Sequence, residues 1–317
     1  NLSEHSQQNQ IIYLIDASIY IFQAHFSPNI ECVDDEGNEL SAVYGFIQFL
    51  LQFLRRIKPE RIGIAMDESL FCGFRHDLCS NYKSNRELPD ENLAMQLNAC
   101  AEVCQIIGLS AYSSKKYEAD DIIGTLSSRM YQHSDDEIAV CIVSRDKDLA
   151  QLLKTSKDYL WDYSSNRKRY RTDIQQEYGV TPEQFPDYLG LVGDAVDCIT
   201  GVPGVGPVKA RELLKNFESL EGVYQNLDLI SQLPLRGAGR LASVLEEHHE
   251  LAKLSKSLAT IVCDAVEEHE DFANAVPDSL RQSGIDLQSF EQFLFEYRFS
   301  QNDRAYLLSV ANQFSRV

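Results

Sequence analysis

Three short apolar runs of this chain each end in aspartate. The runs and the aspartates that follow them are 11–15 with Asp16, 61–66 with Asp67, and 138–144 with Asp146 and Asp148. Continuous apolar runs of this length are typical of strands buried on both faces of a parallel sheet. The carboxyl ends of such strands meet at one edge, where open α/β sheets bind their ligands. The sequence therefore predicts a sheet with carboxylates gathered at one edge.

Amphipathic segments alternate with these runs. Their apolar residues recur with helical spacing over 41–57, 91–108 and 120–131. Strands that alternate with such helices indicate an α/β fold, with a mostly parallel central sheet and flanking helices. A chain of 317 residues is long enough for one large or two medium domains.

Two further groups of acidic residues add to the aspartates at the strand ends. Glu118, Asp120 and Asp121 stand just before an apolar run and after a possible short strand at 109–112. Taken alone, this placement favours a helix N-terminus, where the macrodipole stabilises negative charge. Asp194 and Asp197 are spaced i,i+3 and are expected to share one face of a helix.

Gathering these carboxylates requires compensating positive charge. Two carboxylates about 4 Å apart repel by roughly 4 kcal/mol at an effective dielectric of 20. Protonation, basic partners or bound cations could offset this repulsion, and a set of oxygen ligands without His or Cys suits Mg²⁺ or Mn²⁺. We therefore predict a metal site. The predicted ligands are Asp16, Asp67, Glu118, Asp120, Asp121, Asp146, Asp148, Asp194 and Asp197.

The formal net charge of −19 argues against a nucleic-acid partner only at first sight. Phosphate binding depends on where positive charge is concentrated rather than on the total. Acidic residues concentrate in 261–303, whereas basic residues concentrate in "RKRYR" (167–171) and around Arg75, Lys83 and Arg86. The total charge therefore does not decide the partner.

The cysteines favour a reducing compartment. None of the eight belongs to a CxxC pair, and the only close pair, Cys100 and Cys104, has no His nearby. This pattern predicts buried free thiols in the cytoplasm rather than a zinc site. No stretch of the sequence is long and apolar enough to span a bilayer, so we expect no membrane partner.

Five ordered motifs resemble those of the metal-dependent 5′ nucleases. The motifs are "LIDASIYIFQAHF", "AMDESLFCGFRHDLCSNYKSNR", "YEADDIIGTL", "SRDKDLAQLL" and "LVGDAVDCITGVPGVGPVKA". This family comprises the 5′→3′ exonuclease domain of bacterial DNA polymerase I, free-standing bacterial and phage 5′→3′ exonucleases, and flap endonucleases. "FEYRFSQNDRAYLL" is similar to the closing segment of the family, and the resemblance covers roughly 11–308.

The resemblance implies a domain organisation. A PIN-like nuclease core would occupy 11–170, with an arch segment at about 71–95. A helical helix–three-turn–helix DNA-binding module would occupy 171–261, and an acidic helical segment, 262–317, would pack on the body. The aromatic residues of this last segment are expected in the core: Phe290, Phe293, Phe295, Tyr297 and Phe299.

The resemblance also implies an activity. The protein would be a monomeric, structure-specific 5′→3′ exonuclease or flap endonuclease that cuts DNA at junctions of single strand and duplex by two-metal-ion catalysis. One metal cluster would use Asp16, Asp67, Glu118, Asp120 and Asp146, and the other Asp146, Asp148, Asp194 and Asp197, with Asp121 supporting the first. Two alternatives are a DNA-junction-binding protein without catalysis and a structure-independent ribonuclease of the wider PIN group.

The motif "YKSNR" is expected to contact the substrate. By the resemblance, Lys83 and Arg86 would lie in the arch and place positive charge against the scissile phosphate. Tyr82 would stack on an unpaired base, and Arg75 would contribute to DNA binding. From spacing alone, a solvated loop is an equally good interpretation.

The glycine-rich segment "GVPGVGPVKA" is expected to grip the DNA backbone. Gly204 and Gly206 allow a close approach to phosphate, and Lys209 follows at the start of a helix. By the resemblance, a K⁺ ion would bind to the backbone carbonyls of Leu191, Val192, Thr200, Val202 and Val205. The segment "RKRYR" either extends this surface or is only the exposed turn of a hairpin.

Four positions depart from the residues that are common in the family. Gln23 replaces an Arg, Arg145 replaces the Gly of "GDKD", Cys198 replaces an Asn, and Ala17 replaces a Gly. None of these departures removes a predicted metal ligand. We therefore expect activity, whereas the departures leave efficiency and substrate preference open.

Overall fold

The structure is a computed structural model that describes residues 10–267 and 270–315. The chain forms two compact units, and it passes between them several times. The first unit contains the part up to Glu68, Leu88–Ser144 and the part from Cys263 onward. The second contains Ser69–Glu87 and Arg145–Val262. The domain boundaries expected at residues 170 and 261 stay predictions.

A parallel sheet forms the centre of the first unit. Its strands lie in the order β3 (Ser110–Ser114), β2 (Arg61–Asp67), β1 (Ile11–Asp16) and β4 (Ala139–Val143). All three strand pairings are parallel. Almost every residue of β1 and β4 is buried, as the continuous apolar runs predict. The carboxyl ends of these strands therefore lie at one edge, where Asp16 and Asp67 end adjacent strands.

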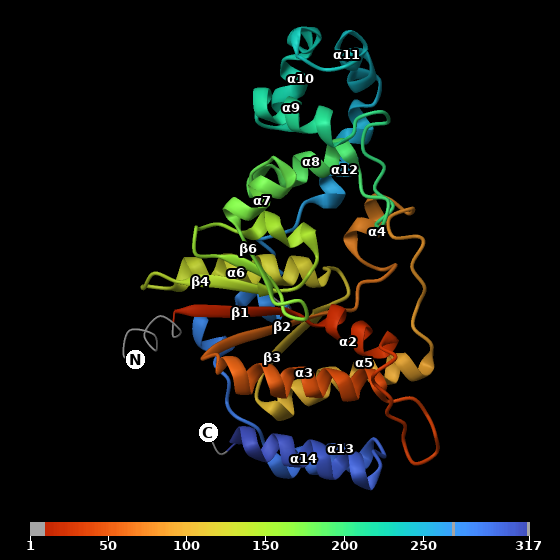
Figure 1. The fold of residues 1–317 in the computed structure, drawn as a ribbon, viewed down its shortest axis with the longest axis vertical. Helices are drawn as coiled ribbons and strands as arrows, with labels where there is room; N and C mark the ends of the chain where they lie inside the picture. The colour runs from red at the N-terminus through yellow and green to blue at the C-terminus, as the bar shows by residue number, and fades with distance from the viewer. Residues whose placement is uncertain (1–9, 268–269, 316–317) are drawn as a thin grey trace. The chain divides into compact units, whose positions relative to one another are not determined.

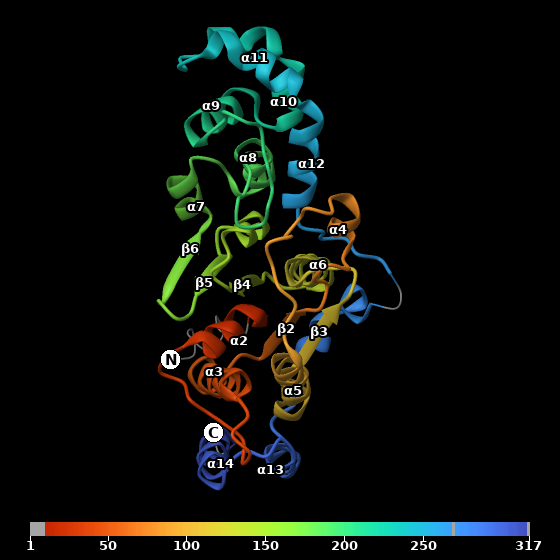
Figure 2. The same cartoon turned by 90° about the vertical axis from the view of Figure 1, so that its right-hand side faces the viewer.

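Helices cover both faces of this sheet. α3 (Ser41–Ile57) and α5 (Glu91–Ile107) lie on one face, and α6 (Ala119–His133) lies on the other (Figures 1 and 2). α2 (Ala17–Phe26) continues directly from β1 and packs on α3. The Asp90 carboxylate begins α5 by accepting a hydrogen bond from the Leu93 amide at 2.8 Å. The α/β class and the three expected helices are thus confirmed.

The helices of the C-terminal segment pack on the outer side of α3 and α5, whereas its 3₁₀ turns contact α6. It contains two 3₁₀ turns, η4 (Asp271–Asn274) and η5 (Pro277–Leu280), and the helices α13 (Leu287–Glu296) and α14 (Gln301–Ser315). α13 contacts α5, and α14 contacts α3. No helix in the described ranges has the length and apolar character needed to cross a membrane.

The aromatic residues of this segment are buried only on the inner side. Phe290, Phe293 and Phe299 are buried, as expected. Phe295 is 69 % exposed, so its placement in the core was wrong. Tyr297 is partly buried, and its hydroxyl donates to Glu102 Oε2 at 2.7 Å. Aromatic content alone could not show which side chains of α13 face the body.

The second unit combines a short hairpin with a helical core. β5 (Tyr159–Asp162) and β6 (Arg167–Tyr170) pair antiparallel. "RKRYR" therefore supplies the second strand of the hairpin, and its interpretation as an exposed turn was wrong. The helices are α4 (Phe74–Leu78), α7 (Arg171–Tyr178), α8 (Phe185–Val192), α9 (Pro207–Phe217), α10 (Leu220–Gln225), α11 (Ala238–Glu247) and α12 (His249–Ala259), with 3₁₀ turns η1 (Lys147–Leu152), η2 (Pro182–Gln184) and η3 (Leu227–Gln232).

The helical core of this unit is built around α8. Phe185, Leu189 and Leu191 of α8 are fully or almost fully buried. α12 packs along α8, and α9 packs beside it, with Leu213 in the shared core. This packing fixes the C-terminal end of α8, from which two of the predicted metal ligands follow.

Candidate metal centre and nucleic-acid contacts

Three carboxylates of the second unit come together. Asp148 lies in η1, and Asp194 and Asp197 lie just after α8. Each offers one carboxylate oxygen, and these oxygens lie within 4.8 Å of one another. Asp148 and Asp194 expose only 7 % and 9 % of their surface, so their mutual repulsion is poorly screened by water. We call this group the carboxylate cluster.

A closed turn, rather than a helix, brings Asp194 and Asp197 together. α8 ends at Val192, and Gly193 follows with a φ of 75°, which ends the helix. The Asp194 and Ile199 backbones then exchange two hydrogen bonds of 2.8 Å. The expectation that the two aspartates share a helix face was wrong, because the glycine stops the helix before either of them.

A lysine partly neutralises the carboxylate cluster. Lys147 Nζ lies 2.7 Å from Asp194 Oδ2 and 3.3 Å from Asp148 Oδ1. Burial lowers the pKa of Lys147, but the neighbouring charges of Asp148 and Asp194 outweigh it and raise that pKa above its ordinary value. Lys147 was not among the predicted site residues, although its place between two predicted ligands in "RDKD" was a signal.

One ammonium group does not compensate the carboxylate cluster. Burial, followed by the negative charge of Asp146, raises the pKa of Asp148 to about 7. Burial also raises the pKa of Asp146. It outweighs the hydrogen bond that the Asp148 amide donates to Asp146 Oδ1 at 3.0 Å, which lowers that pKa. Both carboxyls hold a proton more strongly than an ordinary aspartate, chiefly because burial disfavours their charged form.

The donor set of the carboxylate cluster fits a divalent cation. Asp148 Oδ1 is buried and accepts no hydrogen bond from the described residues, and its one ion-pair partner among them is Lys147, whose Nζ lies 3.3 Å away. A buried carboxylate oxygen without a hydrogen bond requires an explanation, and a bound cation would supply one. All of the available donors are carboxylate oxygens, which hard divalent cations prefer. The carboxylate cluster can therefore hold such an ion.

Five of the predicted ligands lie in the first unit. Asp16 is 4 % exposed at the end of β1, and its Oδ2 accepts a hydrogen bond from Ser144 Oγ at 2.9 Å. Asp67 is exposed at the end of β2. Ser144 was not among the predicted site residues; a polar residue directly after an apolar run was the available signal. Whether Asp16 and Asp67 bind metal stays a prediction.

The "EADD" segment begins α6, as the simpler interpretation held. Glu118 is the residue before the helix, and Asp120 lies in its first turn. Asp121 is fully buried, and its Oδ2 accepts the Glu118 amide at 3.0 Å. Helix capping thus accounts for Asp121. Metal binding by Glu118, Asp120 and Asp121 stays a prediction.

The two expected catalytic cations of the arch lie beside Asp197. The Lys83 amide donates to the Asp197 carbonyl at 3.0 Å, and Arg86 Nη2 lies 3.1 Å from Asp197 Oδ1. Lys83 has a φ of 50°, and its Nζ lies 5.2 Å from the centre of the Tyr82 ring. The segment "YKSNR" is therefore connected to the carboxylate cluster through Asp197.

Tyr82 and Arg75 serve as anchors of the same segment. Tyr82 is 8 % exposed and belongs to the helical core of the second unit. Arg75 is 3 % exposed, and its guanidinium donates to the carbonyls of Leu258 at 2.9 Å and Thr260 at 2.7 Å. A cation at these carbonyls also complements the C-terminal dipole of α12. Base stacking by Tyr82 would require its ring to leave the core, and the guanidinium of Arg75 is already used by the protein.

The glycine-rich segment leaves its backbone accessible. Gly204 has a φ of 82°, and a side chain at Gly204 or Gly206 would meet nothing within 4 Å. Gly206 precedes α9, and Lys209 Nζ donates to the Gly204 carbonyl at 3.2 Å. The amides at the start of α9 are thus presented together with a cation, as phosphate binding requires.

The carbonyls expected to bind K⁺ lie around the same turn. The Leu191 carbonyl accepts the Val202 amide at 2.8 Å, and the Val202 carbonyl accepts the Val205 amide at 3.1 Å. The close approach of Gly193 to the Thr200 carbonyl, and of Gly201 to Val192, brings the neighbouring backbone segments into contact. A carbonyl oxygen has two lone pairs, so these hydrogen bonds leave capacity for a cation.

Together, the parallel sheet that ends in aspartates, the carboxylate cluster and the glycine-rich helix start define an α/β protein with a candidate metal site. The sequence matches the N-terminal resolvase-like domain of 5′-3′ exonucleases over residues 11–182 and their C-terminal SAM fold over residues 180–279. The chain belongs to the 5′-3′ exonuclease family. The resemblance identified from its motifs is thereby confirmed.

Relatives of known name support this assignment. The chain is 33 % identical over 261 residues to a 5′-3′ exonuclease of Buchnera aphidicola (subspecies Acyrthosiphon pisum), which covers 82 % of this chain and 89 % of that protein. It is 34 % identical over 284 residues to DNA polymerase I of Bacillus subtilis; this match covers 89 % of the chain but only 30 % of the polymerase.

Solved structures share the fold. The D15 protein of phage T5, co-crystallised with metal ions, has a TM-score of 0.63 at 16 % identity, covering 96 % of this chain and 99 % of that one. The catalytic core of Rad2 with a DNA substrate has a TM-score of 0.61 at 14 % identity, covering 98 % and 92 %. At these identities the likeness establishes the fold alone.

Proposed function

We propose that the protein is a structure-specific 5′ nuclease that hydrolyses DNA phosphodiester bonds where a single-stranded 5′ end or flap joins a duplex, using Mg²⁺ or Mn²⁺. The observation that carries this proposal is the carboxylate cluster, with its buried Asp148 oxygen, in a chain of the 5′-3′ exonuclease family. A phage T5 flap endonuclease of similar fold was solved in a complex with DNA and metal ions, which supports the same substrate class.

The residues of the second unit would divide the work. Asp148, Asp194 and Asp197 would hold a divalent ion, and Asp146 beside them would share in binding it. When bound, such an ion neutralises the phosphate and makes a nearby water more acidic. Lys83 and Arg86, next to Asp197, would offset the charge of the scissile phosphate.

The glycine-rich segment would hold the duplex. Gly204, Gly206 and the start of α9 present backbone amides, which contact phosphate without reading bases. A K⁺ ion at the carbonyls around Gly193 and Gly201 would stiffen this turn. We propose that the protein acts as a monomer, because a single chain carries both the carboxylate cluster and the duplex grip.

A labelled 5′-flap duplex tests the proposal directly. With Mg²⁺ we expect cleavage near the junction; with excess EDTA, and in Asp146→Ala, we expect cleavage to fall to background. Asp146 is chosen because it is expected to serve both metal clusters. An RNA flap on the same duplex, run in parallel, separates a DNA nuclease from a ribonuclease. Tight binding of the DNA flap without any cut would instead favour a junction-binding protein.

Binding of duplex DNA should weaken steeply with salt. Each neutralised phosphate releases counterions, so the logarithm of the binding constant falls linearly with the logarithm of salt concentration. In Lys209→Gln we expect the slope to decrease by about one. Lys215→Gln is the matched control, because Lys215 lies at the opposite end of α9. Equal slopes in the two variants, measured by fluorescence anisotropy in EDTA, would argue against a phosphate contact at Lys209.

A further inference from the structure

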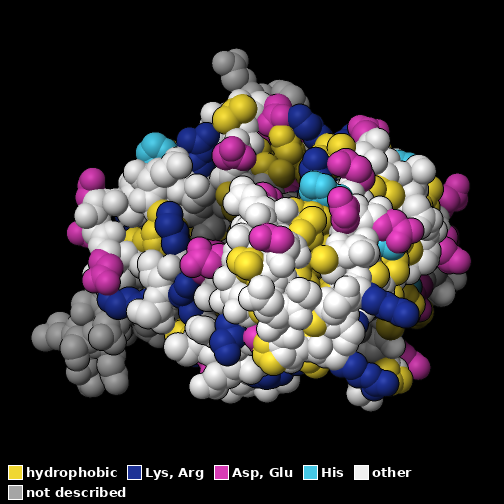
Figure 3. Space-filling view, turned by 90° about the horizontal axis from the view of Figure 1, so that it is seen from above, with side chains coloured by type: hydrophobic (Ala, Val, Ile, Leu, Met, Phe, Trp, Pro, Cys, Tyr) yellow, Lys and Arg dark blue, Asp and Glu magenta, His cyan; other side chains and the backbone are white. Residues whose placement is uncertain are grey.

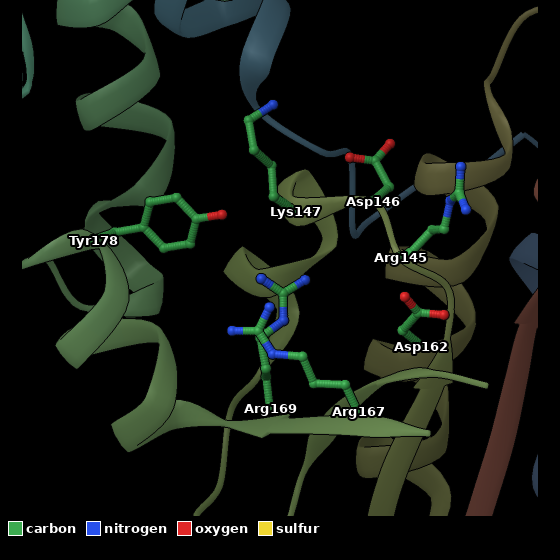
Figure 4. A pocket seen from close by; sticks show the side chains of 7 residues that line it. All are labelled: Arg145, Asp146, Lys147, Asp162, Arg167, Arg169 and Tyr178. Carbon is green, nitrogen blue, oxygen red and sulfur yellow. The ribbon is translucent and has the colours of Figure 1, made fainter. Parts of the chain in front are cut away.

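The second unit contains a cavity of about 380 Å³ with an excess of positive charge. Four cations line it: Arg145, Lys147, Arg167 and Arg169. Asp146, Asp162 and Tyr178 complete the lining, and Figure 4 shows the guanidinium groups of Arg167 and Arg169 side by side, with the Tyr178 hydroxyl directed between them and Lys147. Asp146 and Lys147, which line the cavity, also lie next to the carboxylate cluster. The three arginines of the cavity belong to neither predicted metal cluster.

Strand alternation explains why two arginines enter the same cavity. Arg167 and Arg169 are two residues apart on β6 and therefore project from one face of the hairpin. Lys168, between them, projects from the other face, where its Nζ lies 4.8 Å from the centre of the Trp161 ring. Of the four cations of "RKRYR", Arg167 and Arg169 thus line the cavity, whereas Lys168 projects from the other face and Arg171 pairs with Glu183.

Lys147 is paired with Asp194 and Asp148, but the arginines of the cavity are only partly neutralised. Glu177 pairs with Arg167 at 3.2 Å and with Arg169 at 3.1 Å, so one carboxylate serves two guanidinium groups. Arg169 is 8 % exposed, which makes its remaining positive charge poorly screened. Arg145 is exposed and makes no hydrogen bond or ion pair with the described part of the chain. On the surface of Figure 3, by contrast, basic and acidic side chains are interspersed.

We infer that this cavity binds a phosphate monoester, carried by the 5′ end of a DNA strand or by a mononucleotide. A monoester carries up to two negative charges near pH 7, whereas an internal phosphodiester carries one. A planar guanidinium group can donate two parallel hydrogen bonds to two oxygens of one phosphate. Arg167 and Arg169 lie side by side in the cavity, and both contact Glu177. The volume lies within the range of small-ligand pockets, and the Tyr178 hydroxyl, directed into the cavity, offers a hydrogen-bond donor to a phosphate oxygen. The inference rests on the proposed function for the source of its ligand.

The test compares two oligonucleotides that differ only at the 5′ end. A single strand with a 3′ fluorophore is titrated with the full chain in EDTA, once with a 5′ phosphate and once with a 5′ hydroxyl. We expect the phosphorylated strand to bind about tenfold more tightly. We expect Arg145→Gln and Arg167→Gln to remove most of this preference. Both side chains are exposed, so the variants should fold, which circular dichroism checks.

Lys168→Gln is the matched control, because it removes the same charge from the same strand on the other face. It should keep the preference for the 5′ phosphate. Competition by deoxythymidine monophosphate and by inorganic phosphate then identifies the source: displacement by the nucleotide indicates a mononucleotide site, and displacement only by phosphorylated strands indicates a DNA-end site.

Two results would overturn the inference: equal affinities for the two strands, or an equal loss of preference in Lys168→Gln and Arg167→Gln. The assay contains no metal and requires no cleavage, so it is separate from the nuclease test. Mg²⁺-dependent cleavage without a 5′-phosphate preference would support the proposed function and contradict phosphate binding in the cavity. A 5′-phosphate preference without any cutting would do the reverse.

Discussion

Replacing Asp148 by asparagine should reduce Mg²⁺-dependent cleavage by at least about a hundredfold and yet raise the melting temperature of the metal-free protein. The two effects have one cause. Asp148 is buried among Asp146, Asp194 and Asp197, and Lys147 is the nearest compensating charge. Its negative charge therefore destabilises the folded protein unless a metal ion is bound. Asparagine keeps the shape of the side chain and removes its charge.

The pH dependence of this gain has a definite sign. The pKa of Asp148 is about 7 in the folded chain, above the value of about 3.9 for an unperturbed aspartate. The folded state therefore binds the proton more strongly, and the stability that this proton binding supports is lost as the pH rises from about 4 to about 7. We expect the gain in melting temperature of Asp148→Asn in EDTA to be larger at pH 8 than at pH 5.

Asp158→Asn is the control for this measurement. Asp158 is 1 % exposed, but its Oδ2 accepts the amides of Lys154 and Thr155, both at 2.8 Å. Its negative charge is therefore satisfied by the protein, and the same substitution should lower the melting temperature. A lower melting temperature for Asp148→Asn in EDTA would show that the protein itself satisfies Asp148, and would weaken the case for a metal there.

Gly201→Ala should destabilise the second unit by about 3 kcal/mol, from the strained backbone and the steric overlap together. Gly201 has a φ of 67°, and an added Cβ would lie 2.3 Å from the Gly193 nitrogen and 2.7 Å from the Val192 carbonyl carbon. Those atoms are backbone and cannot move aside without separating α8 from the turn that holds Asp194. The carboxylate cluster should be disturbed along with the fold.

Gly204→Ala is the matched substitution. Gly204 has a similar φ of 82°, but a Cβ there would meet nothing within 4 Å, so we expect a loss of only about 1 kcal/mol. Trp161, the only tryptophan of the chain, lies buried in the same unit and reports urea unfolding by fluorescence. Similar losses in the two variants would mean that the approach of Gly201 to Gly193 is not tight in solution.

Gly204 should matter more for DNA binding than for the stability of the second unit. A methyl group at Gly204 would project from an open backbone, which is where a phosphate would approach under the proposed function. Gly204→Ala should therefore cost more free energy of duplex binding than free energy of unfolding. Undiminished duplex binding would place the DNA backbone elsewhere on the second unit.

Local pattern determined much of this protein. The strands that end at Asp16 and Asp67 follow from continuous apolar runs, and α3, α5 and α6 follow from helical spacing. The order of the motifs determined the family. These features depend on residues near one another in the sequence, so the sequence carries them without knowledge of the fold.

Tertiary structure decided which side chains meet. Gly193 ends α8 and lets a turn bring Asp194 to Asp197, Lys147 enters the carboxylate cluster, and burial takes Tyr82 into the core. The turn after Gly193 is local, but the other two outcomes depend on contacts between segments far apart in the chain, where packing and desolvation outweigh local preference. The sequence by itself therefore determined the elements, the family and the kind of chemistry, and only the packing decided which charges are buried together and which side chains remain exposed.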